Sequence, residues 1–183
     1  MNFCAVIVRF LASLVLLATC GLIVLVHLTP LYSKDTPYTT VGIWQTCETI
    51  AGITSCFRQY IQSSAQCSEM DERTSMLATL SVIWGVNNVH TVGLMIWELF
   101  GLPAPISSLR WILFGWSGGA GLAAVILVWQ TLIADLCSSP LSFNQQGGTA
   151  LNGSFYFTAA LGTTTAAFLL IACAPDVEDV DSN

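Results

Sequence analysis

The sequence predicts an all-α membrane protein, a bundle of four transmembrane helices that carries a small extracellular antiparallel β-sheet. Two observations predict this fold. Of the 183 residues, 54% are hydrophobic and only 9% are charged, a composition that excludes an ordinary soluble domain. The apolar residues gather in long runs, and a polar loop between the first two runs holds Cys47 and Cys56 at a spacing typical of a disulfide-bridged hairpin. We therefore expect one tetraspan domain over residues 1–183.

The first apolar run predicts a membrane span over residues 8–29. Beyond Arg9 it is long enough to cross a hydrocarbon core about 30 Å thick. A cleaved signal peptide is the competing interpretation, with Arg9 as its charged region and Ala18-Thr19-Cys20 as its cleavage site. However, the apolar stretch continues through Val26, beyond the roughly 7 to 15 residues of a signal peptide. This length favours the span.

The second apolar run predicts a span over residues 76–100. Asn87, Asn88 and His90 lie near its middle, where polar groups are unfavourable unless they face another helix. We expect these three side chains to point into the bundle and form interhelical hydrogen bonds. An ion or proton path is the alternative. Glu98, close to the end of the span, is expected at the membrane interface.

The third and fourth predicted spans, residues 111–134 and 154–174, are rich in small residues. Gly115 and Gly119 form a GxxxG in the third span, a spacing that lets two helices approach closely. We expect them to pack inside the bundle, and association with another helix outside it is the second interpretation. The remaining residues, 175–183, make an acidic tail that is too short for a folded domain.

The first outer loop, residues 30–75, is too polar to enter the bilayer. Segments 38–44 and 54–61 are rich in β-branched and aromatic residues, which favour strands. We expect them to form two short antiparallel strands that are bridged through Cys47 and Cys56. This small sheet should lie on the membrane surface.

The cysteines predict the orientation of the chain. Four of them fall in the first outer loop and in the second, residues 135–153. Disulfides persist in oxidising compartments, so both loops should face outward and both termini the cytosol, in a multi-pass plasma-membrane protein. Four cysteines allow three pairings. Cys47 with Cys56 is the pairing we expect, which leaves Cys67 and Cys137 as the candidate second bridge.

The motif Gly42-Ile43-Trp44, followed by Cys47 and Cys56, resembles the signature of the claudin superfamily, which includes peripheral myelin protein and the calcium-channel γ subunits. That signature reads Trp, then Gly-Leu-Trp, then two cysteines. Ile43 replaces the leucine, and the upstream tryptophan has no counterpart here. The resemblance implies four spans with a braced sheet on the first loop. Trp44 should anchor this sheet to the helix ends.

The resemblance also implies a non-catalytic protein that acts through extracellular and lateral protein contacts, and it leaves two functions open. A contact protein would organise cell-cell contacts or a paracellular barrier, and its loop charges would influence ion passage between cells. An auxiliary subunit would pack beside an ion channel or receptor and bias its gating. The loop charges in question are Lys34, Asp35, Glu48 and Arg58.

Several classes of function do not fit the sequence. The formal net charge is −6, with only five Lys and Arg, so the basic surface that nucleic-acid binding requires is missing. His27 and His90 have no partnered nucleophile, and no cysteine pair has metal-binding CxxC spacing. We expect no enzyme activity, cofactor or small-molecule substrate; the partners should be membrane lipid and other membrane proteins. Asn152 begins a glycosylation sequon beside the fourth span.

Overall fold

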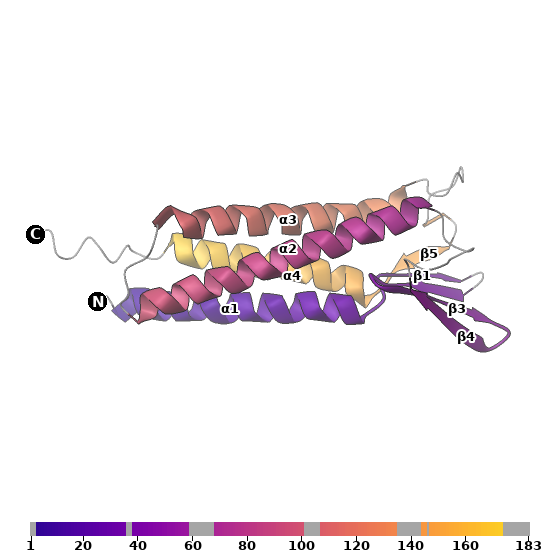
Figure 1. Ribbon diagram of the computed structural model, residues 1–183, viewed down its shortest axis with the longest axis horizontal. Coiled ribbons are helices and arrows are strands. Elements are labelled where there is room, and N and C mark those ends of the chain that lie inside the picture. The colour runs from indigo at the N-terminus through magenta and orange to yellow at the C-terminus, as the bar shows by residue number, and fades with distance from the viewer. Residues whose placement is uncertain are drawn as a thin grey trace, which may run out of the picture.

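The computed structural model describes most of the chain. The described residues are 3–35, 38–58, 68–100, 107–134, 144–145 and 147–173. Within them the chain forms four long helices and a small antiparallel sheet at one end of the helix bundle (Figure 1). We call this the sheet end. The opposite end, where α1 begins and α4 ends, is called the far end.

The helices run alternately up and down, and each packs against two neighbours, in the order α1, α2, α3, α4 and back to α1 (Figure 1). They overlap the four predicted spans, but all of them begin earlier than predicted, and the difference is largest for α2. The early start of α2 is consistent with Glu69 and Asp71 in its first turn, because carboxylates stabilise a helix N-terminus. The bounds are α1 Phe3–Leu28, α2 Ser68–Leu99, α3 Ser107–Ile133 and α4 Asn152–Ala172.

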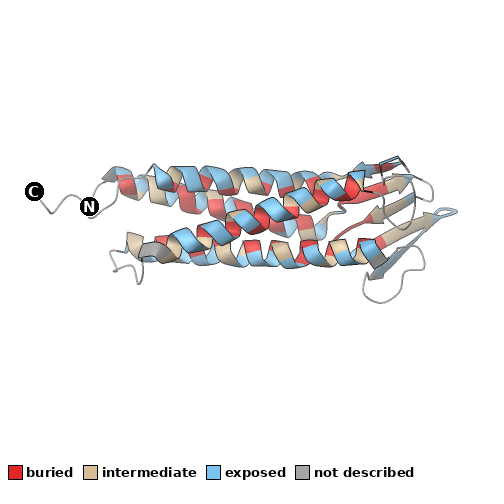
Figure 2. Cartoon of the chain, turned by 90° about the horizontal axis from the view of Figure 1, so that it is seen from above, coloured by how far each residue is buried: buried red, intermediate tan, exposed pale blue. Residues whose placement is uncertain are grey.

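Three of the helices are long and apolar enough to cross a membrane, namely Cys4–Leu28 in α1, Leu109–Ile133 in α3 and Asn152–Ala172 in α4. This indicates a membrane protein. α2 is not among the three, since polar residues lie in its middle. Figure 2 shows exposed outer helix faces around a buried centre, and large apolar side chains cover these faces, as expected for contact with lipid. They include Leu14, Leu17, Val24, Leu122, Ile126 and Leu169.

The buried side chains between the helices form two clusters. At the sheet end the cluster continues from the helices into the first strands, so helices and sheet share one core. A smaller cluster fills the far end. The first contains Leu31, Tyr32, Ile43, Leu77, Trp84 and Phe157, and the second contains Leu16, Met95, Phe114, Ala167 and Ile171.

The sheet has the strand order β4-β3-β2-β1-β5, and all neighbours are antiparallel. Four strands come from the first loop, but β5 comes from the second, with Ser33 opposite Thr149. The prediction that the sheet arises from the first loop alone is therefore wrong. The strands are β1 Tyr32–Asp35, β2 Tyr38–Val41, β3 Gln45–Ile50, β4 Ile53–Arg58 and β5 Gly148–Ala150.

The predicted strand over residues 38–44 also differs from the structure. β2 ends at Val41, and the chain turns at Gly42, whose N–H donates to the carbonyl of Gln45 at 2.9 Å. Cys47 consequently lies within the next strand, β3, and does not follow a single strand over residues 38–44. The turn divides the segment because the Gly42–Gln45 bond closes a four-residue loop there.

Candidate functional site

The disulfide lies at the centre of the β3–β4 hairpin. Cys47 and Cys56 face each other in the strand register and are joined by a disulfide bond, so the predicted pairing is confirmed. Cys67 and Cys137, the predicted second bridge, lie outside the described residues. The bond joins two strands that are already neighbours and fixes the register of the hairpin.

The first two residues of the Gly42-Ile43-Trp44 motif set the turn before β3. A Cβ atom at Gly42 would lie 3.3 Å from the carbonyl oxygen of Gln45, so a side chain would press on the acceptor of the turn hydrogen bond. The side chain of Ile43 is only 1% exposed and belongs to the core at the sheet end. The turn therefore inserts one apolar side chain into the core.

Trp44 attaches this turn to the helices. Its indole Nε1 donates a hydrogen bond to His27 Nδ1 at 2.9 Å, and the two rings stack with centroids 5.4 Å apart. Because Nδ1 accepts, the neutral ring carries its proton on Nε2, which donates to Ser81 Oγ at 3.1 Å. Trp44 thus contacts the end of α1 and, through His27, α2, in agreement with its predicted anchoring role.

The sheet is attached a second time through residues 30–32, where the chain enters β1. The hydroxyl of Tyr32 donates to the carbonyl of Val128 in α3 at 2.9 Å, and the ring is fully buried. This burial raises the pKa of Tyr32 above its ordinary range. In α4, Ser154 Oγ donates to the Leu31 carbonyl at 2.7 Å. A Cβ at Gly153 would lie 2.8 Å from the backbone oxygen of Pro30, so the close approach requires glycine.

The β3–β4 turn is the part of the sheet that projects beyond the bundle (Figure 1). Ala51 and Gly52 both have positive φ angles, 53° and 81°, as in the tight hairpin turns that match strand twist. Ile50 and Ile53 flank the turn and are 62% and 72% exposed. Strand alternation places Phe57, also exposed, on the same face. We call Ile50, Ile53 and Phe57 the apolar tip.

The predicted loop charges do not form one cluster. Lys34 and Glu48 both lie in register with Thr39 on β2, so they share a face about 10 Å apart. Asp35 points to the opposite face and is exposed. Arg58 pairs with Gln45 at the end of the hairpin nearest the helices. Lys34 and Glu48 can therefore act on the same ligand, whereas Asp35 lies on the other face.

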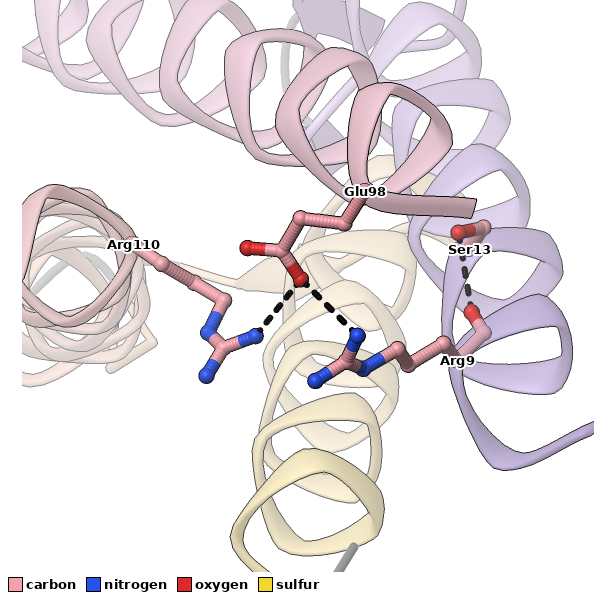
Figure 3. Close-up of polar contacts among 4 residues, drawn as sticks. All are labelled: Arg9, Ser13, Glu98 and Arg110. Carbon is pink, nitrogen blue, oxygen red and sulfur yellow. Dashed lines mark hydrogen bonds and ion pairs between the residues drawn. The ribbon is translucent and has the colours of Figure 1, made fainter. Parts of the chain in front are cut away.

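The far end holds a charged cluster that the sequence analysis did not predict (Figure 3). Glu98 Oε2 lies 3.0 Å from Arg110 NH1 and 3.3 Å from Arg9 NH1. The three side chains are only 11–14% exposed, so Glu98 points between the helices at the far end; its place at the membrane interface stays a prediction. Its place in the alternating topology could have revealed the cluster, because Arg9 and Arg110 open two spans at the end where Glu98 closes a third.

The polar residues in the middle of α2 divide between two faces. Asn88 is fully buried, and Ser117 Oγ of α3 donates to its Oδ1, as predicted. Asn87 is half-buried. His90 is exposed on the outer face, where its Nδ1 bonds to the Val86 carbonyl of its own helix, at 2.8 Å. The prediction that His90 points into the bundle is wrong, because it lies about 200° around the helix from Asn88.

The glycines of the third helix also differ from the prediction. A Cβ at Gly115 or Gly119 would meet no atom within 4 Å, so these residues do not pack inside the bundle. They line an outward groove beside Trp116. The close contact is at Gly121, where a Cβ would lie 2.7 Å from the ring of Trp84. Packing of Gly115 and Gly119 inside the bundle is therefore wrong, and their association with a helix outside it stays a prediction.

Asn152 is the first residue of α4 and is exposed; its glycosylation stays a prediction. Within the described ranges, no three His, Cys, Asp or Glu side chains gather into a group that could hold a metal ion.

No protein-family model matches the chain, and no curated protein matches it. Fold and geometry define a helical membrane protein whose disulfide-bridged sheet is built onto the helix ends.

Proposed function

We propose that this chain is a plasma-membrane protein with four spans that uses its outer sheet to make contacts between neighbouring cells. The observation that carries this proposal is the apolar tip. Large apolar side chains exposed at the end of a sheet outside the membrane are typical of protein interaction sites. The likeness of Gly42-Ile43-Trp44, Cys47 and Cys56 to the claudin signature supports the same function.

α2 is the fourth span in this proposal. It lies alongside three helices that are apolar enough to cross a membrane (Figure 1). Two of its polar groups have partners inside the bundle: Asn88 Oδ1 accepts from Ser117, although its Nδ2 has no partner among the described residues, and Glu98 binds two arginines. Paired polar groups are tolerated inside a membrane bundle. With four spans the two chain termini lie on the same side; the disulfide of the sheet favours the oxidising exterior, so the termini would face the cytosol.

Contact through the tip would bring the sheet charges close to a neighbouring cell. Lys34 and Glu48 lie on the same face as the apolar tip. Charges that line a narrow aqueous path select ions by sign. A paracellular barrier built from this protein would therefore gain its ion preference mainly from these two residues.

Expression in non-adherent cells tests the proposal. The protein should concentrate at boundaries between two expressing cells, and an Ile50→Ser/Ile53→Ser variant should reach the surface but spread evenly. The matched control is Thr49→Ser/Thr54→Ser, which changes the adjacent pair of the same hairpin and keeps its hydroxyl–hydroxyl bond. Even spreading of the wild type, or boundary enrichment that survives in the Ile50/Ile53 variant, would refute a contact function.

An auxiliary channel or receptor subunit is the second candidate. It is favoured by His90, whose polar side chain is exposed on the outer face of α2. A contact protein that acts only through its sheet needs no polar side chain on this face. Even surface distribution together with co-purification with a channel in mild detergent would support this function over the first.

A further inference from the structure

The outer face of α2 carries a regular stripe of exposed residues. Val82, Val86, Val89, Gly93 and Ile96 are all exposed, and they recur at alternating spacings of four and three residues. This is the spacing of a seam along which one helix packs against another. His90 borders the stripe beside Val89. We call these six residues the α2 face.

Two grooves flank the α2 face. One of about 390 Å³ lies between α1 and α2 and is lined by Cys20, Val24 and Gly85 among others. Another of about 460 Å³ lies between α2 and α3 and includes Gly93 and Leu113. Val89 and His90 line both grooves, so they form the ridge between two hollows. Such relief suits the side chains of an additional helix.

The hydrogen bond of His90 fixes what this surface can recognise. Its Nδ1 lies 2.8 Å from the Val86 carbonyl oxygen, and a carbonyl can only accept, so Nδ1 carries the proton. In the neutral ring Nε2 is then an acceptor. Among the described residues no hydrogen bond to Nε2 is formed. The occupant of this surface must therefore donate.

The position of His90 along the helix places this acceptor deep in the membrane. At a rise of about 1.5 Å per residue, it lies about 13 Å from Ser81 at the sheet end and about 12 Å from Glu98 at the far end. Both of those residues are paired with α1. His90 is thus near the midplane of the bundle, where water and lipid headgroups do not reach.

We propose that the α2 face is the docking site for a transmembrane helix of another membrane protein, which donates a hydrogen bond to His90 Nε2. This inference rests on α2 being a span, as in the proposed function. A second copy of the chain does not satisfy the site, because a two-fold contact through this face brings two Nε2 acceptors together. Lipid tails do not satisfy it either, since they have no donor at this depth.

Synthetic helices in lipid vesicles test this proposal. The full-length protein is reconstituted in phosphatidylcholine vesicles with a labelled Leu/Ala-based peptide of about 20 residues that carries either Asn or Leu at its centre. Energy transfer between protein and peptide measures binding. We expect the Asn peptide to bind about three- to twentyfold more tightly than the Leu peptide, the range of interhelical hydrogen bonds in membranes.

Variants distinguish this contact from nonspecific binding of the peptides. His90→Leu should abolish the preference for the Asn peptide, and His90→Gln, which keeps an acceptor oxygen, should retain it. Gly93→Leu should block binding of both peptides. A Cβ atom at Gly93 would meet no atom within 4 Å, so the substitution should leave the fold intact. The matched control is Gly162→Leu on α4. Gly162 is also exposed, with no atom within 4 Å of an added Cβ, and this variant should bind both peptides as the wild type does.

Three outcomes would overturn the proposal: no preference in the wild type, a preference that survives His90→Leu, or energy transfer between protein copies that depends on His90. A Val89→Cys variant distinguishes failure of the span itself. If a membrane-impermeant maleimide labels that cysteine in intact vesicles, α2 is not a span and the four-span proposal fails too. Protection of the cysteine without peptide preference refutes the docking site alone.

Discussion

Glu98→Gln should be the most destabilising single change at the far end. Oε2 of Glu98 accepts from two guanidinium groups at 3.0 Å and 3.3 Å. At an effective dielectric constant of about 20, two unit charges about 4 Å apart attract by about 4 kcal/mol. Both attractions offset the desolvation of the cluster, and the substitution removes both. Arg9 and Arg110 would then face each other as two buried like charges.

The expected loss in the free energy of unfolding is about 3–5 kcal/mol, the usual cost of removing one partner from a buried ion pair. It should fall near the upper end, because Glu98 serves two arginines and Arg110 Nε has no hydrogen-bond partner among the described residues. Unfolding by SDS in mixed micelles, followed by tryptophan fluorescence, measures this loss. Glu72→Gln, at an exposed position of the same helix, should change stability by less than about 0.5 kcal/mol.

A triple variant, Arg9→Leu/Glu98→Leu/Arg110→Met, checks the reasoning. Replacing a whole buried ion cluster by apolar residues is often neutral or stabilising, so this variant should be as stable as the wild type or more so. The reasoning is refuted if Glu98→Gln changes stability by less than about 1 kcal/mol, or if the triple variant is as unstable as the single one.

Three further outcomes are expected in the same unfolding assay. Burial raises the pKa of Tyr32, so the folded state favours the neutral phenol. The contribution of this burial to the free energy of unfolding should be complete below pH about 10 and fall as the pH rises above it. Tyr32→Phe should remove this alkaline loss. Gly121→Ala should cost about 1–3 kcal/mol because its Cβ would meet the buried ring of Trp84, whereas Gly119→Ala, with open space around it, should cost nothing; equal costs would contradict the contact. Cys47→Ser should lose about 2–4 kcal/mol and lower surface delivery, and normal trafficking would count against a structural role for the bridge.

The sequence predicts the helices and the disulfide well because both depend on local or compositional signals. A long apolar run predicts a span whatever its neighbours in the bundle are. The segment between Cys47 and Cys56 is short enough to predict a hairpin. β5 escaped prediction because Gly148–Ala150 is a very short strand that contains glycine. It is a strand only because β1 provides a partner.

Helix orientation was the harder problem. In a membrane bundle the outer face is as apolar as the inner one, so hydrophobic periodicity does not mark the buried side. For this reason His90 and Asn88 could not be assigned to different faces, and Gly121 could not be distinguished from Gly119. The charged cluster was missed for another reason. Its three members are far apart in the sequence, near three different helix ends, and only the alternating direction of the helices indicates that these ends meet.

The pairing of β1 with β5 determines when this protein can finish folding. β1 follows α1 and β5 immediately precedes α4, so a growing chain holds an incomplete sheet until three of the four helices and β5 have been synthesised. The β3–β4 hairpin has no such constraint, since its strands and its disulfide are local. A chain that stops before β5 leaves the edge of β1 open and lacks the Ser154 bond to Leu31. Exposed strand edges are prone to aggregation, so the last strand marks the transition from a vulnerable nascent chain to a protected one.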